Sequence, residues 1–123
     1  MRKITVVCAC AIFIAAQGGA LAGGADVEKV NVKKVADGTY SFDVTVRHGD
    51  TGWDHYANKW DVVGPDGTIY GTRILHHPHE NEQPFTRSKS GVEIPAGVKK
   101  VIVRAGDSVH GYDGRKMDVK LPK

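Results

Sequence analysis

The amino-acid sequence predicts an all-β protein, built as one antiparallel sandwich of seven strands behind a cleaved signal peptide. Three observations predict this fold class. Apolar and polar residues alternate with period two in several segments, as they do in half-buried strands. Tight-turn sequences separate the segments: ADG at 36–38, GPDG at 64–67 and PAG at 95–97. No window carries a sustained apolar stripe at helical spacing.

The first four predicted strands are bounded by two of these turns. Strand 27–35 ends at ADG, and strand 39–47 follows with the clearest alternation in the chain. Its apolar members are Tyr40, Phe42, Val44 and Val46. Strand 58–64 runs into GPDG, and strand 68–75 leaves that turn.

The last three predicted strands follow in the same way. Strand 87–94 ends at PAG, and strand 98–105 begins after it. Strand 115–121 again alternates, with Met117, Val119 and Leu121 on its apolar side. Seven short strands at regular spacing favour an antiparallel sandwich.

The strand pattern resembles immunoglobulin-like and fibronectin type III domains. Trp60 lies on the third predicted strand, where such folds often bury a tryptophan. The resemblance covers the chain after the leader and rests on architecture. The disulfide of true immunoglobulin domains is absent, because the only two cysteines are Cys8 and Cys10.

Residues 1–22 have the order of a secretory signal peptide, and residues 23–123 form the single predicted domain. Arg2 and Lys3 precede an apolar run, which ends near a small-residue site at Ala20 to Ala22. The run is shorter than the roughly 20 residues that span a bilayer. The cysteines lie inside it rather than after it, so a lipid anchor is not expected. We expect cleavage near Ala22 and a periplasmic or secreted protein with no membrane span.

Removing the leader makes the charge nearly neutral. The whole chain has a formal net charge of +3, and the loss of Arg2 and Lys3 reduces it to +1. A domain of this charge is a poor candidate for binding nucleic acid.

All six histidines fall in connections that a sandwich places at one end. Successive antiparallel strands make connections alternate between the two ends, so the three tight turns share one end. The loops 48–57, 76–86 and 106–114 share the other, and they hold His48, His55, His76, His77, His79 and His110. Long loops on a rigid sandwich commonly carry its function.

The histidine-rich end predicts a site for a divalent transition metal, zinc or copper(II). Imidazole nitrogens with a carboxylate or water suit these ions. The candidate ligands are His48, His55, His77, His79 and His110. The simplest set takes one histidine from each loop: His48 or His55, His77 or His79, and His110. Asp54 or Glu80 could bind the metal or orient a ligand.

Two other interpretations of the same loops stay open. Each histidine taken alone could simply bond a neighbouring carbonyl, with Asp50 and Asp107 capping turns and Arg87 and Arg104 pairing with loop carboxylates. The loops could instead form a contact surface for a protein or glycan, responsive to pH between about 5 and 7. That surface would consist of Trp53, Asp54, Tyr56, His76, Glu80, Glu82 and Tyr112.

An enzyme is not expected. Ser108 and His110 are two residues apart on a glycine-rich loop, which is no triad signature, and no phosphate loop or zinc-protease helix occurs. Asp54-His55-Tyr56 and His110-Gly111 resemble short segments of superoxide reductases, which are also immunoglobulin-like. That family needs a cysteine thiolate on its iron. The chain after the leader has no cysteine, so the resemblance does not extend to the activity.

Overall fold

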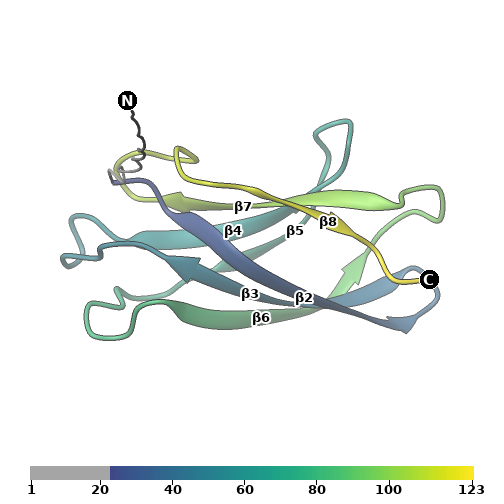
Figure 1. Cartoon of the computed structure of the whole chain (residues 1–123), viewed down its shortest axis with the longest axis horizontal. Helices are drawn as coiled ribbons and strands as arrows, with labels where there is room; N and C mark the ends of the chain where they lie inside the picture. The colour runs from purple at the N-terminus through teal and green to yellow at the C-terminus, as the bar shows by residue number, and fades with distance from the viewer. Residues whose placement is uncertain (1–22) are drawn as a thin grey trace, which may run out of the picture.

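Two antiparallel sheets packed face to face make up the described part of the chain, residues 23–123 of a computed structural model (Figure 1). The predicted signal peptide, residues 1–22, lies outside the described residues. One sheet has the order β2-β3-β6 and the other the order β5-β4-β7-β8. The strands are β2 (Asp26–Ala36), β3 (Thr39–Arg47), β4 (Ala57–Val63), β5 (Ile69–Ile74), β6 (Phe85–Glu93), β7 (Lys100–Asp107) and β8 (Met117–Lys120). The all-β prediction is confirmed for these residues, which contain no helix long and apolar enough to cross a membrane.

All seven predicted strands are present, and their ends differ from the predicted ones by at most two residues. The difference that matters for function is at the end of β7. Pairing with β4 continues to the Ala57–Asp107 pair, so β7 ends at Asp107 rather than at residue 105. Asp107 therefore belongs to a strand and is held by the sheet.

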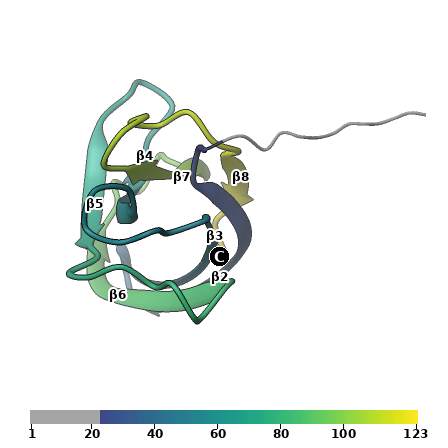
Figure 2. The same cartoon turned by 90° about the vertical axis from the view of Figure 1, so that its left-hand side faces the viewer.

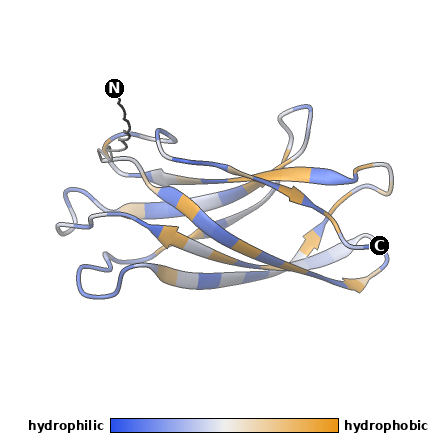
Figure 3. Ribbon diagram, in the orientation of Figure 1, coloured by the Kyte–Doolittle hydropathy of each residue, from blue (hydrophilic) through white to orange (hydrophobic). Residues whose placement is uncertain are grey.

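The core follows the alternation in the sequence. Phe42, Val44 and Val46 are fully buried between the sheets, and Trp60 of β4 is fully buried opposite them, as the sequence predicts. Figure 3 shows apolar and polar positions alternating along the strands. Because Phe42, Val44 and Val46 point inward, the same parity directs His48 inward beyond the end of β3.

The two ends of the sandwich differ as predicted. The β2–β3, β4–β5 and β6–β7 connections are tight and lie at one end, while the three long loops lie at the other (Figure 1). Seen from that second end, the three long loops face the viewer, and the start of β2 lies next to the β7–β8 loop (Figure 2). The six histidines are therefore at one end of the molecule.

Candidate metal centre

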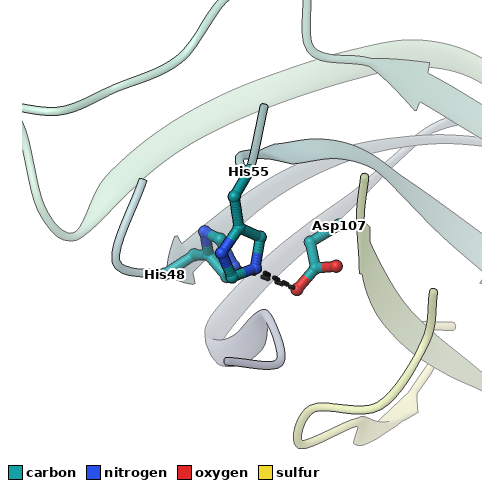
Figure 4. A group of neighbouring side chains, drawn as sticks. All are labelled: His48, His55 and Asp107. Atoms are coloured by element: carbon teal, nitrogen blue, oxygen red, sulfur yellow. Dashed lines mark hydrogen bonds and ion pairs between the residues drawn. The ribbon is translucent and has the colours of Figure 1, made fainter. Parts of the chain in front are cut away.

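Four side-chain atoms from two regions of the chain, the β3–β4 loop and the end of β7 with the loop after it, converge at the loop end. They are Nε2 of His48, Nε2 of His55, Nδ1 of His110 and Oδ2 of Asp107. The Asp107 oxygen lies 3.0 Å from the His48 nitrogen, 3.4 Å from that of His55 and 3.1 Å from that of His110. The nitrogens of His55 and His110 are 3.2 Å apart. Figure 4 shows His48, His55 and Asp107 directed at one another. We call these four residues the donor cluster.

The two sheets hold the inner half of the donor cluster. His48 directly follows β3 and is only 3% exposed. Asp107 is the last residue of β7, and its side chain is fully buried. His48 and Asp107 thus come from opposite sheets and meet at the mouth of the core.

Contacts within the loops position the outer two members of the donor cluster, His55 and His110. His55 is bridged to Gly52, whose carbonyl accepts a hydrogen bond of 3.2 Å from the His55 main-chain nitrogen. The main-chain nitrogens of Val109 and His110 both donate to Oδ1 of Asp107. Asp107 therefore shapes the turn that carries His110 with one oxygen and faces the three histidines with the other.

Asp107 remains a carboxylate in this environment. Burial alone would raise its pKa, but hydrogen bonds from the main chain and ring of His110, from Val109 and from His55 outweigh burial. Together they lower the pKa of Asp107 from 3.8 to about 2. A negative oxygen consequently faces the three imidazole rings at every ordinary pH.

Asp50 fixes the orientation of His48 from the other side. Its Oδ1 lies 2.5 Å from Nδ1 of His48 and accepts from the main-chain nitrogen of Ala57. Its Oδ2 accepts from the main-chain nitrogen of His79. A carboxylate on one ring nitrogen of a histidine sets the tautomer and presents the other nitrogen as a lone pair, the usual arrangement behind a metal ligand.

The spacing of the donor cluster suits a transition metal. Histidine binds zinc at about 2.0–2.1 Å, so a tetrahedral arrangement separates neighbouring donor atoms by about 3.3 Å. Four of the six separations between donor atoms, from 3.0 to 3.4 Å, are close to that value. The donor atoms of His48, His55 and Asp107 also all lie within 4.8 Å of one another. Three imidazole nitrogens and one carboxylate oxygen match the ligand preference of zinc or copper(II).

The predicted ligands of the β5–β6 loop form a separate group. His79 is 5% exposed, stacks on the Phe85 ring at 3.9 Å, and its Nε2 accepts a hydrogen bond of 2.9 Å from Arg87. His77 is exposed and lies against His79 at 4.6 Å. Neither contributes an atom to the donor cluster. The guanidinium of Arg87 occupies Nε2 of His79, and its Nδ1 has no hydrogen-bond partner among the described residues.

Metal-free protein should lose stability below neutral pH partly through His79. Burial lowers the pKa of His79 below its ordinary value of 6.5, and the charge of Arg87 lowers it further. Because the folded-state pKa is the lower one, this contribution is present above pH 6.5 and is lost as pH falls through the folded value. We expect His79→Leu to lose less stability than the wild type between pH 7 and pH 5 in urea unfolding. The exposed His76→Leu is the control, and equal losses in His79→Leu and wild type would contradict the assignment.

The predicted contact surface is only partly on the surface. Trp53 is 66% exposed and packs edge-on against Tyr56 at 5.5 Å. The other exposed members are Asp54, His76, Glu80 and Glu82. Tyr112 is half-buried, and its hydroxyl donates to the buried Asp61 at 2.6 Å.

The two arginines assigned to ion pairs behave differently. Arg87 pairs with the loop carboxylate of Glu82 at 3.2 Å, as the sequence predicts. Arg104 pairs instead with Asp61, a strand residue, and lies over the Tyr112 ring at 3.9 Å. These contacts tie the β7–β8 loop, which carries His110, to the four-stranded sheet.

The sequence predicts only a turn-capping role for Asp50 and Asp107, two carboxylates of the site. Asp107 does cap the turn at His110, and it also faces the three histidines; Asp50 orients His48. The available signal was their position in the histidine-bearing loops, with Asp50 two residues from His48 and Asp107 three residues from His110.

No protein-family model matches the chain, and no solved structure matches it. The chain is 40% identical over 95 residues to a protein of Halomicrobium mukohataei described as "Putative lipoprotein". The match covers 77% of this chain and 46% of that protein, so the chain spans about half the length of the curated relative it matches.

Proposed function

We propose that this protein is an exported, non-catalytic binding protein that holds one divalent transition metal ion, zinc or copper(II), in the donor cluster. The observation that carries the proposal is the convergence of three imidazole nitrogens on one carboxylate oxygen, at 3.0 to 3.4 Å. Its ligands would be His48, His55, His110 and Asp107. The relative described as a lipoprotein supports export, because lipoproteins are proteins of the cell envelope.

The surroundings of His48 are suited to a positively charged ion beside its Nε2. Carboxylate oxygens face both of its ring nitrogens, Asp50 at 2.5 Å and Asp107 at 3.0 Å. A neutral imidazole has one N–H and donates to only one of them, so a positive charge, carried by a second ring proton or by a metal ion, is needed at the other. With the proton on the Asp50 side, Nε2 offers a lone pair beside the Asp107 carboxylate, and a cation between them relieves the repulsion.

We also propose that the sandwich is related to immunoglobulin-like domains. Its division into one three-stranded and one four-stranded sheet supports this relationship. Strand β5 pairs with β4 on the four-stranded sheet, whereas the fourth strand of an immunoglobulin constant domain joins the other sheet. We therefore favour the fibronectin type III-like form of the sandwich.

Calorimetric titration tests metal binding directly. Zinc and copper(II), each titrated into micromolar protein, are expected to fill one site, and His55→Ala and His110→Ala are expected to remove it. Both histidines are partly exposed, so these changes leave the core intact. His77→Ala, at the same end but outside the donor cluster, is the matched control. No saturable heat in the wild type, or wild-type heat in both cluster variants, would refute the proposal.

A contact surface is the second candidate function, and the exposure of Trp53 favours it. Trp53 is 66% exposed and Val109 59% exposed, on two loops joined by a 2.9 Å hydrogen bond from the Ser108 nitrogen to the Tyr56 carbonyl. Exposed aromatic side chains on adjacent loops suit a protein or glycan partner. Binding of this kind would be indifferent to chelator, whereas the metal protein loses stability with it.

A further inference from the structure

The chain segment that leads into β2 packs directly on the donor cluster. The main-chain carbonyl oxygen of Gly23 lies 2.8 Å from Nε2 of His48, the same nitrogen that faces Asp107. Gly23 has a φ of 92°, which side-chain-bearing residues rarely adopt. The backbone is thus turned in a way that brings its carbonyl to the cluster.

Gly23 also borders a second donor. A Cβ atom on Gly23 would come within 2.5 Å of Cε1 and 3.1 Å of Nδ1 of His110. The backbone of Gly23 therefore lies next to ring atoms of both His48 and His110. Only glycine leaves room for the His110 ring at this position.

Two further glycines hold the segment in place. A Cβ on Gly24 would lie 2.7 Å from the nitrogen of Gly114, and a Cβ on Gly114 would lie 1.9 Å from the carbonyl oxygen of Ala25. Backbone therefore packs on backbone between residues 23–25 and the loop that carries His110. Beyond them Arg115 donates its main-chain N–H to Asp26 at 2.7 Å, which continues the contact into β2.

We propose that the Gly23 carbonyl oxygen is a fifth ligand of the metal, so that residues 23–25 close the site from the amino-terminal side. The inference rests on the proposed metal function. Some catalytic zinc sites expand to five ligands, and blue-copper sites can hold a backbone oxygen as a weak axial ligand. The oxygen is already placed beside the first ligand, at a separation similar to those among the four side-chain donors. A bound metal in turn fixes residues 23–25 against the β7–β8 loop.

The coordination shell of the wild-type protein gives the first test. X-ray absorption at the zinc edge is expected to show five nitrogen or oxygen neighbours, including one oxygen beyond the Asp107 carboxylate. A shell of four ligands in a protein that binds one zinc would overturn the inference and leave the metal function standing. Failure of the wild type to bind zinc would instead refute the proposed function.

Glycine substitutions give the second test. Gly23→Ala and Gly24→Ala are expected to weaken zinc binding about tenfold to 100-fold, the usual effect of disturbing a group that supports a metal site. Gly49→Ala is the matched control: it lies at the same end, its Cβ meets no atom within 4 Å, and its φ is ordinary. Thermal melting of each metal-free variant separates a binding effect from unfolding. Wild-type affinity in both folded variants would overturn the inference.

Metal binding should also protect the segment that leads into β2 against amide hydrogen exchange. Amide hydrogen exchange at residues 24–26 is expected to slow on zinc binding, while exchange at the opposite end, in the 64–68 turn, stays unchanged. No slowing in a zinc-saturated wild type would argue against closure of the site by residues 23–25.

Discussion

Zinc at a hundredfold excess over its dissociation constant is expected to raise the melting temperature by about 10–20 °C. A ligand that binds only the folded state at this excess stabilises it by about 2.7 kcal/mol. For a domain of about 100 residues, each 1 kcal/mol moves the melting temperature by roughly 4–8 °C. The donor cluster exists only when both sheets are assembled, because His48 follows β3 and Asp107 ends β7. Differential scanning calorimetry with and without zinc measures the shift.

Substitutions test whether the rise in melting temperature comes from zinc bound in the donor cluster or from zinc bound elsewhere on the protein. His55→Ala should remove it, and excess chelator should reverse it in the wild type. His76→Ala should keep it, since His76 is exposed and lies on the β5–β6 loop, which contributes no atom to the donor cluster. A shift of equal size in wild type and His55→Ala would mean that zinc binds elsewhere.

The fold could be predicted closely because its signals are local. Alternation in β3 follows from one face of the strand packing on the core, and tight turns such as GPDG require Gly, Pro or Asp wherever they occur. The sorting of loops between the two ends then follows from strand direction alone. The end of β7 was less predictable, because its extension to Asp107 depends on pairing with Ala57 of β4.

The site could be predicted only as a region. The sequence places all six histidines at one end, but which of them converge depends on tertiary contacts. His79 resembles a ligand by its neighbours in sequence, yet the fold stacks it on Phe85 and gives its ring nitrogen to Arg87. Gly23 carries no side chain, so no sequence pattern indicates a main-chain contribution from it.

The donor set also bears on the resemblance to superoxide reductases. His55 and His110, the histidines of the two resembling segments, both belong to the donor cluster. The remaining donors are another histidine and a carboxylate, with no thiolate. The cluster therefore lacks the thiolate on which the iron chemistry of that family depends.

Replacing Asp107 with alanine is expected to remove metal binding and to lower the stability of the metal-free protein by about 3–5 kcal/mol, the usual cost of breaking a buried charge network. The side chain is fully buried and accepts from the main-chain nitrogens of Val109 and His110 as well as facing three histidines. Alanine leaves these donors without an acceptor. Urea unfolding of metal-free wild type and variant measures the loss.

Asp107→Asn separates the two roles of the carboxylate. The amide oxygen can still accept from Val109 and His110, so much of the stability should return. The charge that faces the histidines is lost, so zinc affinity should not return. Wild-type zinc affinity in Asp107→Asn would contradict the assignment of Asp107 as a ligand.

The pH dependence of the unfolding free energy of Asp107→Asn tests whether the charge of Asp107 stabilises the metal-free protein. The pKa of Asp107 is about 2 in the folded protein and 3.8 ordinarily. Its contribution to stability is therefore complete above pH 4 and is lost as pH falls from about 4 to 2. Metal-free wild type should lose more stability than Asp107→Asn across this interval, because the asparagine does not titrate. Parallel losses in the two proteins would mean that the charge of Asp107 does not stabilise the loop that holds His110.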